Sequence, residues 1–149
     1  MKSTEEIEKS LVTLSLIFYL VSLFLPAIYV FVPSFGKSIS YDGWYALFVG
    51  SLSATMNVKQ ALIWLVNPIY LLALFSMKFR PKIALFFSLF VLITSLTFLG
   101  FENIQYTWSG RVMFINSLGF GYWFWSISFV LLLVAAFMNL TGDKNQYIT

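Results

Sequence analysis

Two apolar runs joined by a basic turn occupy residues 61–101: ALIWLVNPIYLLALFSM (61–77), KFRPK (78–82) and IALFFSLFVLITSLTFLGF (83–101). Neither run contains a charged residue. A helix needs about 20 apolar residues, each rising about 1.5 Å, to cross about 30 Å of hydrocarbon. The two runs therefore predict two membrane-spanning helices connected by a tight turn.

Charge-free intervals on either side of this pair predict two further spans. Residues 10–36 and 112–142 contain no Asp, Glu, Lys or Arg. Within these intervals we place helices at about 11–32 and 118–139. Together with the central pair they give four crossings, so the sequence predicts a four-helix transmembrane bundle.

The composition supports this interpretation. Of the 149 residues, 60% are hydrophobic and 10% are charged, whereas soluble domains contain about 25% charged residues. A soluble fold of this length could not bury so much apolar surface. The sequence thus predicts an all-α integral membrane protein, with a single transmembrane domain over residues 1–149.

The basic residues predict that both termini lie in the cytoplasm (N-in/C-in), because short cytoplasmic segments carry an excess of Lys and Arg. This orientation puts six basic residues inside: Lys2, Lys9, Lys78, Arg80, Lys82 and Lys144. It puts three outside: Lys37, Lys59 and Arg111. The five tryptophans then fall on the outer side, where indole rings favour the wet boundary of the bilayer.

Two structured segments are expected on the outer side. Residues 43–57 are apolar at first and polar later, which favours a short interfacial or re-entrant helix. Residues 104–115 are rich in β-branched and aromatic residues around Ser109-Gly110, which predicts a small β-hairpin. A two-residue turn there would pair Tyr106 with Met113. The segment 34–41 could add a strand.

The absence of Cys and His excludes most catalytic and metal chemistry. Thiol redox, Ser–His catalysis, haem ligation by His and nearly all zinc and copper sites need these residues. We therefore expect no catalytic residue, no cofactor and no metal. The outer acids Asp42 and Glu102 leave open an enzyme acting on lipid-linked substrates. Glu102 is also a possible partner of Arg111 in an ion pair across the base of the hairpin.

Two prolines, together with the expected interfacial or re-entrant segment at 43–57, suggest a cavity that opens outward. Pro68 cannot donate a backbone hydrogen bond to Trp64, and Pro26 would have the same effect in the first predicted helix. The residues expected around this possible cavity are Ser22, Pro26, Trp64, Asn67, Pro68 and Tyr70. The alternative, favoured because Pro is common in membrane helices, is that both prolines are ordinary kinks and Asn67 bonds neighbouring helices.

These observations favour a small non-enzymatic membrane protein that acts through protein–protein contacts on its outer face. It could be an accessory subunit, a self-associating bundle or an immunity-type protector. The alternative is binding or passage of a small neutral or weakly polar solute through the outward cavity. The expected partners are the bilayer and a second copy or another membrane protein, not nucleic acid. The expected location is a bacterial cytoplasmic membrane.

Overall fold

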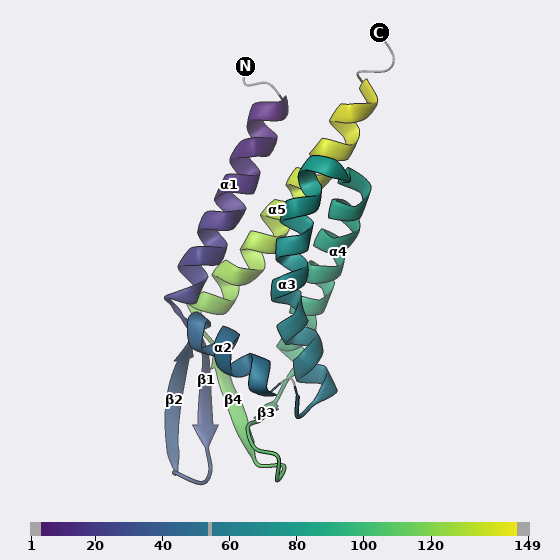
Figure 1. Cartoon of the computed structure of the whole chain (residues 1–149). Helices are drawn as coiled ribbons and strands as arrows, with labels where there is room; N and C mark the ends of the chain where they lie inside the picture. The colour runs from purple at the N-terminus through teal and green to yellow at the C-terminus, as the bar shows by residue number, and fades with distance from the viewer. Residues whose placement is uncertain (1–3, 54, 146–149) are drawn as a thin grey trace.

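The computed structural model describes residues 4–53 and 55–145 (Figure 1). Four long helices run side by side, a small sheet lies at the end of the molecule opposite the termini, and a short helix crosses between them. The elements are α1 (Thr4–Leu23), β1 (Pro26–Val32), β2 (Lys37–Asp42), α2 (Gly43–Ser53), α3 (Val58–Phe79), α4 (Pro81–Thr97), η1 (Phe98–Gly100), β3 (Asn103–Gln105), β4 (Val112–Leu118) and α5 (Phe120–Asn145).

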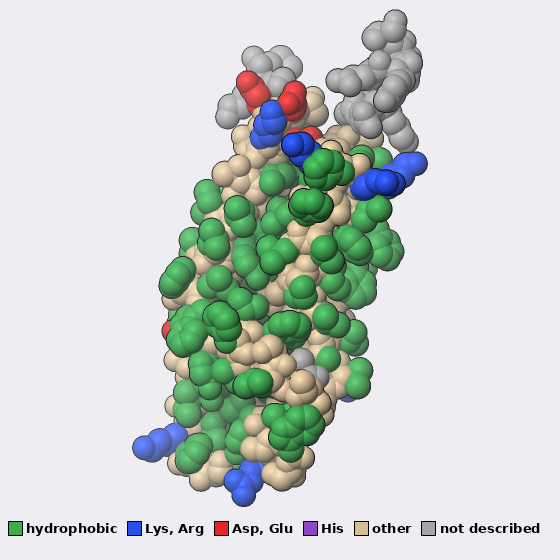
Figure 2. All heavy atoms as spheres, in the orientation of Figure 1, with side chains coloured by type: hydrophobic (Ala, Val, Ile, Leu, Met, Phe, Trp, Pro, Cys, Tyr) green, Lys and Arg blue, Asp and Glu red, His purple; other side chains and the backbone are tan. Residues whose placement is uncertain are grey.

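Three helical segments are long and apolar enough to cross a membrane: Val58–Phe79, Pro81–Gly100 and Phe120–Thr141. They confirm helices where the second, third and fourth spans were predicted. Figure 2 shows hydrophobic side chains over most of the visible flank and Lys or Arg at both ends. An apolar flank between two charged ends is the surface expected of a protein whose solvent is lipid.

The predicted first span, 11–32, is wrong in its second half. Helix α1 ends at Leu23, and residues 26–32 form strand β1. Along β1, Ile28, Val30 and Val32 are buried while the residues between them are exposed. This alternation is the period of a strand. Pro26 is therefore the first residue of a strand, not a kink in a helix.

The sheet is antiparallel, with strand order β2-β1-β4-β3. Strand β2 begins at Lys37, so the suggested strand at 34–41 exists with shifted bounds. The predicted hairpin at 104–115 also exists, but its register differs from the prediction. Met113 lies opposite Ile104, not Tyr106.

A wider turn explains that register. Gly110 N donates to Thr107 O, and Arg111 N donates to the Thr107 side chain at 3.0 Å. These bonds close a loop longer than two residues. Gly110 has a φ of +82°, a backbone conformation that costs glycine little.

Glycines let the helices pass close to the corner where α1 meets β1. A Cβ at Gly119 would overlap the carbonyl oxygen of Pro26, and a Cβ at Gly43 would overlap that of Ser22. The backbones are near enough to bond: Gly119 N donates to Ala27 O at 2.9 Å, and Gly43 N donates to Leu25 O at 3.0 Å. This corner fixes the sheet and α2 against the bundle.

The bundle is built around α5, which packs against α1 on one side and α4 on the other, while α3 packs on α4. Small residues face the neighbouring helices along α4, where Ala84, Ser88 and Ser95 are buried. The Ser88 hydroxyl donates to Ala84 O at 2.8 Å. The hydroxyls of these serines therefore find hydrogen-bond acceptors within their own helix, and their small side chains permit close helix packing.

Candidate functional site

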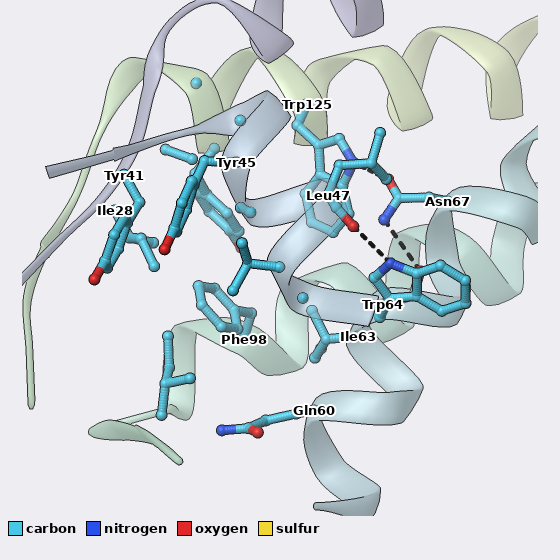
Figure 3. A pocket seen from close by; sticks show the side chains of 18 of the residues that line it. Ile28, Tyr41, Tyr45, Leu47, Gln60, Ile63, Trp64, Asn67, Phe98 and Trp125 are labelled. Atoms are coloured by element: carbon cyan, nitrogen blue, oxygen red, sulfur yellow. Dashed lines mark hydrogen bonds between the residues drawn. The ribbon is translucent and has the colours of Figure 1, made fainter. Parts of the chain in front are cut away.

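A cavity of about 340 Å³ lies where the sheet, α2 and the helical bundle meet (Figure 3). Its size is within the range of small-molecule sites, about 300–1,000 Å³. Strand and helix ends form its walls, and α2 lies along one side. The lining residues are Ser22, Leu23, Ala27, Ile28, Tyr41, Gly43, Tyr45, Ala46, Leu47, Val49, Gly50, Leu52, Met56, Gln60, Ile63, Trp64, Asn67, Phe98, Phe101, Ile104, Gln105, Tyr106, Met113, Gly121, Tyr122 and Trp125.

Of the six residues expected around a cavity, three line this one: Ser22, Trp64 and Asn67. The other three are not among the lining residues. Pro26 belongs to β1, and Pro68 lies inside α3. Tyr70 is fully buried in the bundle, where its hydroxyl lies 2.8 Å from that of Ser15.

Asn67 satisfies the carbonyl that Pro68 leaves without a helical donor. Its Nδ2 donates to Trp64 O at 3.1 Å. Its Oδ1 accepts from the Tyr19 hydroxyl and from Trp125 Nε1, both at 3.0 Å. One amide thus bonds α1, α3 and α5 together at the inner end of the cavity. Asn67 therefore bonds neighbouring helices, as the alternative interpretation of the Asn67-Pro68 pair predicted.

Trp64 holds α2 in place beside the cavity. Its Nε1 donates to the Leu47 carbonyl at 2.8 Å, a bond drawn in Figure 3. Gly50 lets α2 approach, because a Cβ there would lie 3.3 Å from Trp64 Cδ1. A side-chain donor from a bundle helix therefore sets the position of this short helix.

Two stacked tyrosines form the wall nearest the sheet. The rings of Tyr41 and Tyr45 lie 4.5 Å apart with an interplanar angle of 4°. The Tyr41 hydroxyl donates to Met113 Sδ at 3.6 Å, and sulfur is a weak acceptor. Burial raises the pKa of Tyr41 above its ordinary value, and the neighbouring Tyr45 raises it further. The Tyr41 hydroxyl is therefore protonated at neutral pH and can donate a hydrogen bond.

The cavity is uncharged. Among the described residues that line it, none is Asp, Glu, Lys or Arg. The residues with polar side-chain atoms are Ser22, Tyr41, Tyr45, Gln60, Trp64, Asn67, Gln105, Tyr106, Tyr122 and Trp125. Most of these are aromatic, so each adds a large apolar surface to one polar atom. Such a lining suits a neutral molecule that is mostly apolar.

The sequence pattern placed the segment of α2 beside a cavity but did not indicate which residues of α2 and the sheet line it. Tyr41, Tyr45 and Phe98 were not expected to meet Trp64 and Asn67. One signal was available: Gly43 lies between the two tyrosines, and a glycine there permits the close approach to α1.

The possible ion pair between Glu102 and Arg111 is not formed. Among the described residues, the ion pair within 4.0 Å joins Lys9 and Glu5. Glu102 O accepts from Ile115, whereas Arg111 O accepts from Tyr106. Arg111 is thus four residues along the strand from the position opposite Glu102, roughly 13 Å away.

The two acids Asp42 and Glu102 are also apart. Asp42 ends β2 and Glu102 precedes β3, and these strands are the two edges of the sheet. Three strand spacings separate the edges, roughly 14 Å. In the part of the chain that the structure describes, no group of three His, Cys, Asp or Glu residues is placed to hold a metal ion.

Comparisons with protein-family models, with curated proteins and with solved structures gave no match to this chain.

Proposed function

We propose that this chain is a non-enzymatic membrane protein that binds a small, neutral, mostly apolar molecule in the cavity between its bundle and its sheet. The observation that supports this proposal is the uncharged aromatic cavity of about 340 Å³. A charged ligand buried there would find no described counter-ion, and an unpaired buried charge is strongly unfavourable. A neutral molecule would have no such cost.

The proposal places the chain in the membrane with four crossings and both termini in the cytoplasm. The two ends of the described chain lie at the same end of the bundle, opposite the sheet (Figure 1). Helix α1 packs along α5, and its 20 residues rise about 30 Å. Lys78, Arg80 and Lys82 belong to the turn at the terminal end of the bundle, as the positive-inside rule requires.

This orientation exposes the sheet to the outside. We propose the bacterial cytoplasmic membrane as the location, because the chain is small, its loops are compact and it has no cysteine. The cavity then lies near the outer boundary of the bilayer.

A second function, contact with another membrane protein, is favoured by a different observation. Phe35, between β1 and β2, and Trp108, between β3 and β4, are exposed in the two hairpin loops. These loops lie at the end of the molecule farthest from the termini (Figure 1). Phe31 and Phe114 lie opposite each other on the outward face of the sheet and are also exposed. Aromatic side chains are enriched at protein interfaces, so an accessory subunit or a self-associating bundle would use this end.

Thermal unfolding of the purified protein in nanodiscs tests the ligand proposal. We expect cyclohexanol, a small neutral probe, to raise the midpoint of unfolding with a saturable dependence on concentration. Sodium benzoate, whose carboxylate is charged, should not. Ala46 lines the cavity, so Ala46→Trp should abolish the effect of cyclohexanol.

Phe75→Trp is the control, since Phe75 is exposed on α3 and is not among the residues that line the cavity. It should keep the full response. An equal response of both tryptophan variants would show that the probe acts on the bilayer and not in the cavity, and the proposal would then be abandoned.

A further inference from the structure

We infer that the ligand of this cavity is a neutral amphiphile taken from the bilayer, such as a long-chain alcohol or another lipid whose polar end is a single uncharged oxygen function. Its oxygen would bond to Tyr41, and its hydrocarbon would extend past α2. The inference rests on the proposed binding function and adds the chemical class of the ligand and the side from which it enters.

The cavity reaches the surface beside the second half of α2. Among the described lining residues, the exposed ones are Val49 and Leu52, with 37% and 64% of their surface accessible. The other lining residues are half-buried or buried. The entrance is therefore an apolar rim on α2.

That rim faces an apolar environment. Trp44, Phe48 and Leu52 recur every four residues along α2, which puts them on one side of the helix. They are 47%, 68% and 64% exposed. Exposure of such a stripe to water is unfavourable by about 25 cal/mol per Å², whereas exposure to lipid is not.

The helix next to α2 also exposes apolar side chains. Helix α2 packs on α3, a candidate membrane span, and Leu62 and Leu65 on α3 are exposed as well. A molecule that leaves the cavity past Leu52 therefore meets lipid before it meets water.

The two ends of the cavity differ in chemistry. At the sheet end, the hydroxyls of Tyr41 and Tyr45 belong to the wall (Figure 3). At the bundle end, Asn67 already bonds Trp64 O, Tyr19 and Trp125 through both of its side-chain polar atoms. The indole N–H groups of Trp64 and Trp125 also donate hydrogen bonds to protein acceptors. The bundle end thus presents mainly hydrocarbon and ring surface.

We assign the hydrogen bond of the ligand to Tyr41, which lines the cavity and stacks on Tyr45. The present acceptor of the Tyr41 hydroxyl is the sulfur of Met113, at 3.6 Å. An alcohol or carbonyl oxygen is a stronger acceptor than a thioether, so a ligand oxygen would improve this bond. A phosphate or carboxylate would instead bring a charge into a cavity without a described basic residue.

Photolabelling in nanodiscs tests the inference. The full chain would be exposed to hexadecanol that carries a diazirine in its chain, and to hexadecanoate with the same diazirine. We expect the alcohol to label peptides from α2 and the start of α3, and the acid to label them at least tenfold less. Unlabelled hexadecanol should compete. Equal cavity labelling by the acid would overturn the neutral-ligand inference.

Two tyrosine variants test the hydrogen bond. Tyr41→Phe keeps the ring that stacks on Tyr45 and removes the hydroxyl, and we expect labelling by the alcohol to fall about five- to tenfold. Tyr29→Phe is the control, because Tyr29 is exposed on the other face of the sheet. Equal labelling of both variants would remove Tyr41 from the site.

The experiment separates this inference from the proposed function. If cyclohexanol stabilises the protein through the cavity but the hexadecanol probe does not label it, the binding function stands and the bilayer ligand is wrong. If neither probe binds, both are wrong.

Discussion

Asn67 Nδ2 donates to the backbone carbonyl of Trp64 at 3.1 Å, and that carbonyl is the one deprived of its helical donor by Pro68. The side chain one residue before the proline thus repairs the hydrogen bond that the proline removes. Its Oδ1 is then directed at α1 and α5, where it accepts two further bonds. The sequence pair Asn-Pro therefore acts as one unit that locks three helices.

Replacing Asn67 by Leu should lower the stability of the bundle. The change leaves Trp64 O without a donor, and Tyr19 and Trp125 without an acceptor, inside the protein. We expect a loss of about 2–3 kcal/mol in the free energy of unfolding, measured by reversible denaturation in mixed micelles. In a Pro68→Ala background the restored backbone N–H can serve Trp64 O, so the loss should be about 1 kcal/mol smaller. An identical loss of stability in both backgrounds would contradict the claim that Asn67 replaces the hydrogen bond that Pro68 removes.

The corner between α1 and β1 should tolerate no side chain at Gly119. A Cβ there would overlap the Pro26 carbonyl, whose position is fixed by the strand. We expect Gly119→Ala to lower the free energy of unfolding by about 3 kcal/mol or to prevent folding. Gly100→Ala is the control, because a Cβ at Gly100 has no neighbour within 4 Å. Yield in detergent and the unfolding midpoint compare the two; a stable Gly119→Ala protein would contradict the close approach.

The central helices could be predicted from the sequence, but the end of helix α1 could not. Charge gaps are sufficient where an apolar run is bounded closely by charges, as at Lys82 and Glu102. They fail between Lys9 and Lys37, because α1 and β1 follow each other without a polar break. In β1 the exposed residues are apolar too, as with Phe31. Without contrast in hydropathy, the period of two cannot be seen.

Only part of the candidate site could be predicted from the sequence. Pro68 indicated a local break in helix hydrogen bonding, so the nearby Trp64 and Asn67 were expected beside a cavity. Tyr41 and Tyr45 come from the sheet and α2, and their place depends on backbone contacts between distant segments, such as Gly43 N to Leu25 O. Such long-range pairing leaves no local pattern in the sequence.

Removing the indole N–H of Trp64 should loosen α2 without unfolding the bundle. Trp64→Phe deletes the bond to Leu47 O while keeping an aromatic ring against Gly50. We expect amide hydrogen exchange in α2 to rise about fivefold, equivalent to about 1 kcal/mol, with exchange in α4 and α5 unchanged. Trp108→Phe, at an exposed turn, should change neither region. Unaltered exchange in α2 would mean that its position does not depend on this bond.

Cysteine labelling should decide whether α1 crosses the membrane. The chain has no cysteine, so single substitutions report one site each. With four crossings, Ser109→Cys at the tip of a hairpin should react with a membrane-impermeant maleimide in intact cells. Thr4→Cys in α1 and Thr141→Cys in α5 should react only after permeabilisation, because both lie at the opposite end of the bundle (Figure 1).

The labelling results at Thr4 and Thr141 together distinguish three crossings from four. Three crossings would put Thr4 and Thr141 on opposite sides of the membrane, so that one of them reacts in intact cells. In that case α1 would lie outside the hydrocarbon and its exposed apolar residues, such as Ile17 and Leu20, would need another cover. Protection of both sites, together with reaction at Ser109, would establish that α1 spans and that the cavity faces the outer boundary.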